Sequence, residues 1–174
     1  MFDVLLNNAG LSVGLDKIQD GVIDDWERMI DTNVKGLLYV TKQILPGMVA
    51  RNNGHVINIG SIAGHSVYPR GNVYCATKFA VRALTEGMLI DTVYTQVKIS
   101  AISPGLVDTE FSTIRFKGDK EKADNVYKGI EALTAEDISD VVIFCATRPK
   151  HVNLTDMVVL ATNQASGSVV YRET

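Results

Sequence analysis

The sequence is poor in cysteine and proline and contains no long apolar run. Two cysteines among 174 residues cannot build a disulfide framework, and no Cys/His cluster has the spacing of a metal site. We therefore expect a cytoplasmic protein without a bound metal. No apolar stretch approaches the roughly 20 residues that cross a bilayer, so we expect no membrane partner. No repeat or linker divides the chain, which predicts one domain over residues 1–174.

The sequence also lacks an excess of charge of either sign. Seventeen basic and 20 acidic residues give a formal net charge of −3. A nucleic-acid-binding surface needs clustered positive charge, so nucleic acid is excluded as an expected partner. The hydrophobic share of 46% and the charged share of 21% are ordinary for a globular domain, which excludes disorder and fibrous structure.

Short β-branched runs alternate with longer segments of helical periodicity. The expected strands cover residues 4–6, 55–59, 97–103 and 157–160, and the expected helices cover residues 24–45, 73–94 and 134–146. Asp24 or Asp25 is expected to cap the first helix, and Thr134 with Asp137 forms a capping-box pattern before the last. Strands that alternate with helices predict right-handed βαβ units, and hence an α/β fold with a parallel sheet.

Open parallel sheets bind ligands in a crevice at the carboxyl ends of their strands. The residues after the first three expected strands, 7–10, 60–64 and 104–109, should therefore carry the chemistry. Residues 110–133, called the lid segment below, form a polar connection that is long for a plain loop. We predict that the lid segment covers the site.

Tyr74 and Lys78 are four residues apart near the start of the second expected helix, so both side chains lie on one face. A lysine cation there is expected to lower the pKa of the phenol, which makes Tyr74 a usable general acid or base. Ser61 follows the second expected strand, where its hydroxyl can donate to a substrate carbonyl or simply cap a turn. A Tyr-x-x-x-Lys match arises by chance in about one such chain in three, so only its combination with Ser61 is informative.

Asn33 lies in the middle of the first expected helix, where asparagine is unfavourable, beside apolar positions that face the core. A buried amide there needs hydrogen-bond partners, and an ordered water could be one of them. His55, His65 and His151 are far apart in the sequence, and we interpret them as surface or strand-end residues.

Taken together, five elements in this order and spacing resemble the short-chain dehydrogenase/reductase family. They are Asn7-Asn8-Ala9-Gly10, Asn33, Ser61, Tyr74-Cys75-Ala76-Thr77-Lys78 and Pro104-Gly105. Within the family, residues 109–119 and 151–153 resemble the NADP-dependent 3-hydroxy acid dehydrogenases. The resemblance extends over essentially the whole chain and implies a Rossmann-like, doubly wound parallel sheet.

The resemblance implies a role for each of these residues. Tyr74 would be the general acid/base, Lys78 would lower its pKa and hold the nicotinamide ribose, Ser61 would bind the substrate oxygen, and Asn33 would hold a relay water. Two loops would contact the cofactor. The first would lie on the adenosine side, through Asn7, Ala9 and Gly10, and the second would lie along the nicotinamide, through Pro104, Gly105, Val107 and Thr109. Arg115 and Lys117 in the lid segment could meet a substrate carboxylate, although solvation explains their charges equally well.

One departure from the family concerns the amino-terminal side of the fold. Family members have a strand, a glycine-rich turn and two further strands before the Asn-Asn-Ala-Gly segment, whereas this sequence begins at the strand that leads into it. The resemblance thus implies a partial sheet, without the first three strands and the glycine-rich loop, and an apolar edge along residues 4–6. The segment that selects NAD or NADP is not in the sequence, so NADP is expected from the branch resemblance and NAD stays open.

We expect an NADP-dependent oxidoreductase that transfers hydride on a small 3-hydroxy acid or its semialdehyde. This small molecule is the expected partner, and the family resemblance implies a homo-oligomer, either a dimer or a tetramer. Two alternatives stay open: a catalytically impaired binding or assembly module, and an enzyme that resembles the 3-oxoacyl carrier-protein reductases. Residues 109–119 argue against the second alternative.

Overall fold

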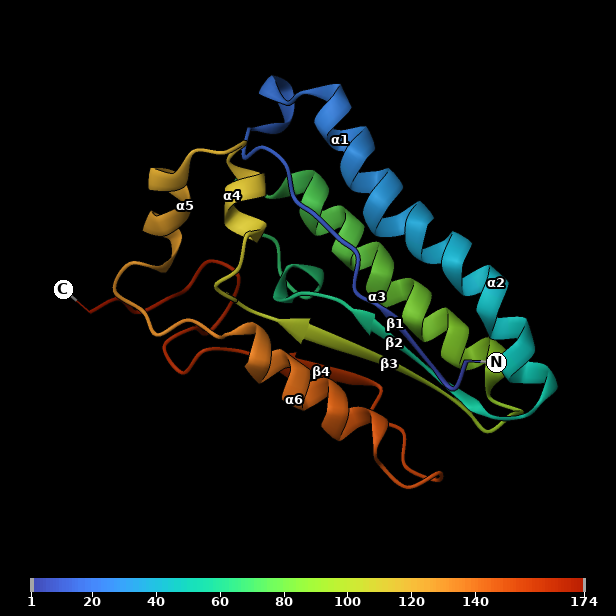
Figure 1. Ribbon diagram of the computed structural model, residues 1–174. Coiled ribbons are helices and arrows are strands. Elements are labelled where there is room, and N and C mark those ends of the chain that lie inside the picture. Colours follow the sequence, from blue (N-terminus) through green and yellow to red (C-terminus); the bar gives the residue numbers. More distant parts are fainter. Residues whose placement is uncertain (1, 174) are drawn as a thin grey trace.

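Four parallel strands form one sheet in the computed structural model, which describes residues 2–173 (Figure 1). They lie in sequence order as β1 (Val4–Asn7), β2 (Gly54–Ile59), β3 (Val97–Pro104) and β4 (Asp156–Val159). Every neighbouring pair is parallel, with Leu6 opposite Ile57 and Ile57 opposite Ser100. The predicted α/β fold with a parallel sheet is confirmed, and each strand ends within one residue of its expected bounds.

The first expected helix is one continuous helix with a wider, π-helical turn in its middle. α1 (Ile23–Ile30) passes through a π-helical segment, η2 (Asp31–Gly36), into α2 (Leu37–Ala50). α3 (Asn72–Thr92) and α6 (Ala135–Ala146) occupy the other two expected positions. The lid segment contains α4 (Phe111–Arg115) and α5 (Lys120–Tyr127). Short 3₁₀ turns lie at η1 (Ile18–Asp20) and η3 (Ile62–Gly64).

Helices cover both faces of the sheet (Figure 1). α2 and α3 pack on one face, where Met48 and Val81 cover Val56. α6 packs on the other face, where Cys145 covers Ile57. Successive residues of β2 point to opposite faces and are buried on both, which explains why this strand reads as an apolar run in the sequence.

The last crossover connection differs in hand from the first two. α2 and α3 return the chain over one face, whereas α6 returns it over the other. The strand order nevertheless continues in the same direction from β1 to β4. The β3–α6–β4 unit therefore has the opposite hand, and the expectation that all units are right-handed is wrong. This reversal puts helices on both faces of the sheet.

The helix caps confirm one expectation and overturn another. Thr134 and Asp137 form a complete capping box, in which the Thr134 amide donates to Asp137 Oδ2 at 2.8 Å and the Asp137 amide donates to Thr134 Oγ1 at 3.2 Å. α1, in contrast, has no side-chain cap. Asp24 and Asp25 lie inside its first turn, where their negative charges interact favourably with the positive end of the helix dipole. Asp25 is buried and pairs with Lys117 Nζ at 2.7 Å.

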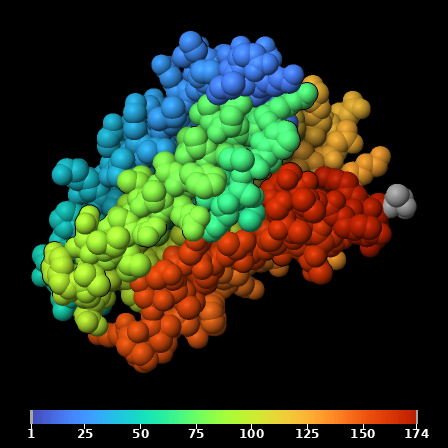
Figure 2. All heavy atoms as spheres, turned by 180° about the vertical axis from the view of Figure 1, so that it is seen from behind, coloured from blue at the N-terminus to red at the C-terminus, as the bar shows by residue number. Residues whose placement is uncertain are grey.

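The two edges of the sheet differ. β1 lies at one edge, and its exposed Val4 and Leu6 side chains form the predicted apolar edge. Beyond β4, at the other edge, the carboxyl-terminal segment lies alongside the region of α3 (Figure 2). His65 Nε2 lies 3.5 Å from an Asp156 carboxylate oxygen there, so the loop before α3 contacts the start of β4.

The three histidines occupy different environments. His151 is exposed and His65 is half-buried, but His55 lies inside β2 with only 3% exposure. Its Nε2 lies 2.8 Å from Ser100 Oγ. The interpretation of His55 as a surface residue is therefore wrong, because Cys145 of α6 lies 3.9 Å from its Nε2, whereas its position at the start of β2 agrees with a strand-end residue. Between residues 2 and 173, no three His, Cys, Asp or Glu side chains gather as a metal site, and no helix is long and apolar enough to span a bilayer.

Candidate functional site

One large cavity, of about 820 Å³, opens at the carboxyl ends of the strands. The predicted residues that line it are Gly10, Ser61, Tyr74, Lys78, Pro104, Gly105, Val107, Thr109 and Arg115. Asn7, Ala9 and Asn33 lie outside its lining. The lid segment forms another wall through Phe111 and Tyr127, as predicted. The fold therefore brings the loops after three strands and the lid segment to one crevice.

Ser61 and Tyr74 are brought together because η3 packs closely on α3. Ser61 Oγ accepts from the Ala63 amide at 3.1 Å. The Ser61 hydroxyl also lies close enough to the Tyr74 side chain to lower the pKa of the phenol. The turn-capping role considered for Ser61 is therefore confirmed, and its donation to a substrate carbonyl stays a prediction. A Cβ on Gly64 would lie 2.7 Å from the Lys78 carbonyl oxygen, so only glycine allows this approach of the two segments.

The Tyr74 side chain is buried beside the lid segment. It is 7% exposed, and its ring centroid is 5.6 Å from that of Phe111. Burial raises the pKa of Tyr74, whereas the Ser61 hydrogen bond and the Arg115 charge act in the opposite direction. Lys78 Nζ lies 5.9 Å from the ring centroid. The expected lowering of the Tyr74 pKa is not found, because burial outweighs the groups that favour the phenolate.

The Lys78 side chain extends from α3 to the end of β2 and is buried there. Its Nζ donates to the Ile59 carbonyl at 2.9 Å. Burial lowers the pKa of Lys78 to about 8, so the side chain is mainly a cation at neutral pH. A Cβ on Gly10 would lie 3.5 Å from Nζ, which places the loop after β1 directly beside this cation. An ammonium group has three N–H donors, so a ligand in the cavity would find donors that the Ile59 bond leaves free.

Asn33 lies in the π-helical segment and is 2% exposed. Its Oδ1 accepts from the Leu11 amide at 2.8 Å, and its Nδ2 donates to the Leu11 carbonyl at 2.8 Å and to Thr77 Oγ1 at 3.0 Å. Protein atoms therefore take both amide protons, where an ordered water was expected as one partner. The wide turn of η2 turns this side chain inward, so that it ties the loop after β1 to α3.

Arg115 lies beside Tyr74 and is held by two hydroxyl groups. Its Nε donates to Ser12 Oγ at 3.2 Å, and its Nη2 donates to the Tyr68 hydroxyl at 3.0 Å. Its Cζ lies 4.9 Å from the Phe111 ring centroid and 5.3 Å from that of Tyr74. Among residues 2–173, no carboxylate forms an ion pair with Arg115. The large cavity thus contains an oriented guanidinium group whose charge is not neutralised by the described part of the chain.

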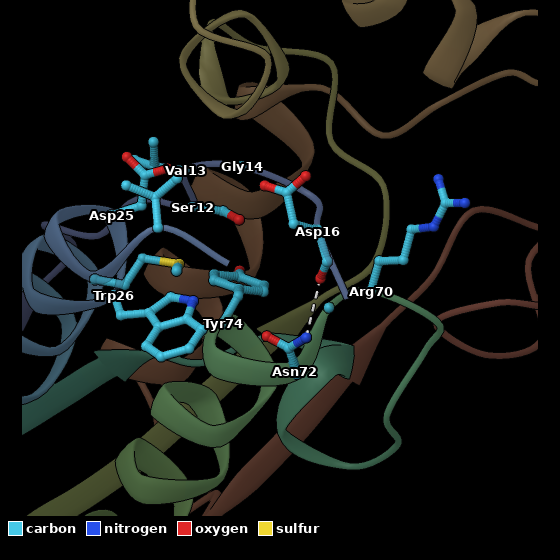
Figure 3. A pocket seen from close by; sticks show the side chains of 12 residues that line it. Ser12, Val13, Gly14, Asp16, Asp25, Trp26, Arg70, Asn72 and Tyr74 are labelled. Carbon is cyan, nitrogen blue, oxygen red and sulfur yellow. Dashed lines mark hydrogen bonds between the residues drawn. The ribbon is translucent and has the colours of Figure 1, made fainter. Parts of the chain in front are cut away.

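A second and much smaller cavity, of about 20 Å³, lies on another side of Tyr74 (Figure 3). Asp25 and Trp26 of α1 contribute to its wall. Lys117 pairs with Asp25 and does not line the large cavity. Of the two cations considered for a substrate carboxylate, only Arg115 lines the large cavity.

The two loops implied in cofactor binding are held by the side chains of half-buried Asn7 and buried Gln164. Asn7 Nδ2 donates to Thr41 Oγ1 at 3.0 Å and to Asn58 Oδ1 at 2.8 Å. This side chain therefore ties the start of the first loop to α2 and β2. Gln164 Oε1 accepts from the Leu106 amide at 2.9 Å and so holds the loop after β3. The main chain of both loops is therefore positioned before any ligand binds.

Sequence reasoning missed several residues of the cavity wall, namely Asn8, Tyr68, Tyr127 and Gln164. Tyr127 donates from its hydroxyl to the Val107 carbonyl at 2.9 Å and contacts Ser112 Oγ at 2.7 Å. It thereby joins the lid segment to the loop after β3. The partners of these residues are distant in the chain, so no local pattern marks them. Asn8 alone had a signal, because it lies within the Asn-Asn-Ala-Gly segment.

These features define a class of protein: an open parallel α/β sheet whose crevice holds a serine–tyrosine pair, a neighbouring lysine and a large cavity. The chain belongs to the short-chain dehydrogenase family, since the family model described as short chain dehydrogenase matches residues 1–120.

Several relatives are similar along nearly the whole chain. The NADP-dependent 3-hydroxy acid dehydrogenase of Schizosaccharomyces pombe is 47% identical over 98% of this chain and 66% of its own length. The NADP-dependent 3-hydroxy acid dehydrogenase YdfG of Salmonella typhi is 51% identical over 98% of this chain and 69% of its own length. A solved structure, the closed form of serine dehydrogenase complexed with NADP+, has a TM-score of 0.93 and 46% identity over 99% of this chain and 70% of that one. The chain therefore spans about two thirds of the length of these relatives.

Proposed function

We propose that the protein is an oxidoreductase that uses NADP to transfer hydride on a small 3-hydroxy acid or its semialdehyde. One observation carries this proposal: the crevice places the Ser61–Tyr74 pair and the unpaired guanidinium group of Arg115 side by side in one cavity. The first can act on a hydroxyl or carbonyl oxygen, and the second attracts a carboxylate. A short hydroxy acid carries both groups.

The proposed chemistry follows from the positions of the side chains. In the reducing direction, Ser61 donates a hydrogen bond to the substrate carbonyl oxygen, and Tyr74 delivers a proton to the same oxygen as its charge develops. The Lys78 cation, 5.9 Å from the Tyr74 ring centroid, stabilises the negative charge that develops on the phenol oxygen and hydrogen-bonds the ribose. Asn33 keeps the loop after β1 and α3 in register and holds the end of a proton relay. In the oxidising direction, Tyr74 takes the proton instead.

The residues around the cavity fit a nicotinamide dinucleotide. Gly10, beside the Lys78 cation, gives close access to the main chain, and Asn7 and Ala9 complete this loop on the adenosine side. Pro104, Gly105, Val107 and Thr109 would lie along the nicotinamide, on the loop that Gln164 fixes. When bound, the cofactor supplies or accepts the hydride.

The choice of cofactor and substrate is supported by the names of the relatives. Those at 47% and 51% identity are named NADP-dependent 3-hydroxy acid dehydrogenases. A structure of a 3-oxoacyl-[acyl-carrier protein] reductase with bound NAD is only 25% identical. The similarity therefore favours NADP and short acids over NAD and acyl chains.

The experiment that tests the proposal follows NADPH formation by the purified chain with NADP+ and 3-hydroxypropanoate, beside a fluorescence titration with NADPH. Saturable binding and acid-dependent reduction of NADP+ are expected. Saturable binding without turnover of any short hydroxy acid would contradict the assigned substrate class. Absence of both would favour the alternative of a binding or assembly module.

Replacing Arg115 with alanine is expected to raise KM for 3-hydroxypropanoate at least about tenfold, because a charge-assisted hydrogen bond to the carboxylate is lost. The KM for NADP+ should change little. Arg28→Ala, which removes an exposed arginine of α1, is the matched control. An unchanged KM for the acid in Arg115→Ala would remove Arg115 from the substrate site.

We also propose a homo-oligomer, a dimer or tetramer, in the cytoplasm. Apolar side chains are exposed on α2 and α3, including Leu38, Tyr39, Val40, Phe79 and Ile90. A second copy that covers them would remove this surface from water. Both cysteines are free and buried, which suits a reducing compartment.

A further inference from the structure

Tyr68 lines the large cavity, and its hydroxyl has an unused proton. It accepts from Arg115 Nη2 at 3.0 Å. No acceptor for the Tyr68 O–H lies among residues 2–173. Burial raises the pKa of Tyr68, so the hydroxyl keeps its proton throughout the neutral range. Tyr68 thus offers a donor to whatever molecule lies next to Arg115 in the cavity.

Arg115 is held in one orientation by its neighbours. A guanidinium group has five N–H donors, and two of them are taken by Ser12 and Tyr68. The three that are left include both N–H groups of Nη1. Aromatic rings on several sides, with centroids 4.9–5.8 Å from Cζ, restrict its movement further. An arginine fixed in this way loses little entropy when it binds a planar anion.

Ser12 is itself fixed through the main chain. It is 2% exposed, and the neighbouring Leu11 is bound at both its amide and its carbonyl by Asn33. The Gly14 amide donates to the Arg115 carbonyl at 3.0 Å. The loop after β1 therefore hydrogen-bonds both the main chain and the side chain of Arg115. Ser12 and Tyr74 also line the same small cavity (Figure 3).

From these contacts we infer that Tyr68 and Arg115 together form the receptor for a substrate carboxylate, with Ser12 as the positioning residue that aims the guanidinium group. This inference rests on the proposed function and deepens it. One carboxylate oxygen accepts from the Tyr68 hydroxyl, and the guanidinium group donates to the acid from its free N–H groups. Because the Arg115 Cζ lies 5.3 Å from the Tyr74 ring centroid, the carboxylate is only a few carbon atoms from the reacting carbon. The site therefore selects short acids over their neutral esters.

The test compares 3-hydroxypropanoate with its methyl ester in the wild type, Tyr68→Phe and Ser12→Ala. Tyr68→Phe is expected to raise KM for the acid about tenfold, and Ser12→Ala to raise it about threefold, with kcat and the KM for the ester nearly unchanged. Tyr171→Phe is the control for the first change, because Tyr171 is exposed. Ser66→Ala is the control for the second, because Ser66 Oγ is buried near Tyr68 and has no partner among residues 2–173.

An equal loss on acid and ester, or no change on either, would overturn the inference and leave Tyr68 with a purely structural role. If the wild type turns over neither compound, the proposed function fails while the receptor can still be tested by binding. The Arg115 Nε–H signal in NMR is then followed during titration with 3-hydroxypropanoate. Saturation in the wild type with about tenfold weaker binding in Tyr68→Phe supports the receptor. Equal affinity in both proteins, or no binding to the wild type, overturns it.

Discussion

Replacing Tyr74 with phenylalanine is expected to lower kcat for 3-hydroxypropanoate oxidation at least about a hundredfold, because general acid–base catalysis contributes on this scale. The change removes one oxygen atom from a side chain that is buried against Phe111, so the ring packing is preserved. KM for the acid should change far less than kcat, since Arg115 and Tyr68 still hold the carboxylate. Steady-state kinetics over a range of acid concentrations separate the two constants.

The control for this experiment is Tyr94→Phe, in which an exposed tyrosine of the turn after α3 loses its hydroxyl. It should leave both constants unchanged. A kcat in Tyr74→Phe within a few-fold of the wild type would show that another group moves the proton.

His55→Gln is expected to make the folded protein more resistant to acid. Burial lowers the pKa of His55 to about 4, whereas an unfolded histidine titrates near 6.5. Between pH 4 and pH 6.5, His55 binds a proton in the unfolded chain but stays neutral in the folded chain. The free energy of unfolding therefore falls as the pH falls. The loss begins near pH 6.5 and reaches about 3 kcal/mol at pH 4.

Urea unfolding at a series of pH values measures this effect. The wild type should lose stability between pH 6.5 and pH 4 more steeply than His55→Gln, even though the variant starts lower because the contact with Ser100 is altered. His151→Gln, at an exposed position, should follow the wild-type slope. Parallel pH profiles for wild type and His55→Gln would show that His55 is protonated in the folded state.

The elements of the fold could be predicted because their signals are local. The apolar run of β2 and the capping box of Thr134 and Asp137 depend on residues close in the chain, and both are confirmed. The prediction that Asp24 or Asp25 caps α1 was wrong, because the sequence pattern of a carboxylate at a helix start does not distinguish the cap position from the first turn. Only the distant partner Lys117 explains why Asp25 is buried.

The candidate site could be predicted as a set of residues, but its electrostatics could not. Helical spacing puts Tyr74 and Lys78 on one face, whatever surrounds them. The direction of the Tyr74 pKa shift depends instead on burial by the lid segment and on the charge of Arg115. The same limit applies to His55, whose burial follows from the position of α6 on the far face of the sheet. Such effects arise from packing between elements that are far apart in the chain.

The close contact of Gly64 with the main chain of Lys78 joins η3 and α3 into a single rigid body that carries Ser61, Tyr74 and Lys78. The contact resists a shift of η3 against α3, so the main chain fixes the spacing between Ser61 and the Tyr74–Lys78 pair. Arg115 and Phe111 belong to the lid segment, outside this body. Changes in the lid segment can therefore alter the position of Arg115 while the spacing of Ser61, Tyr74 and Lys78 stays the same.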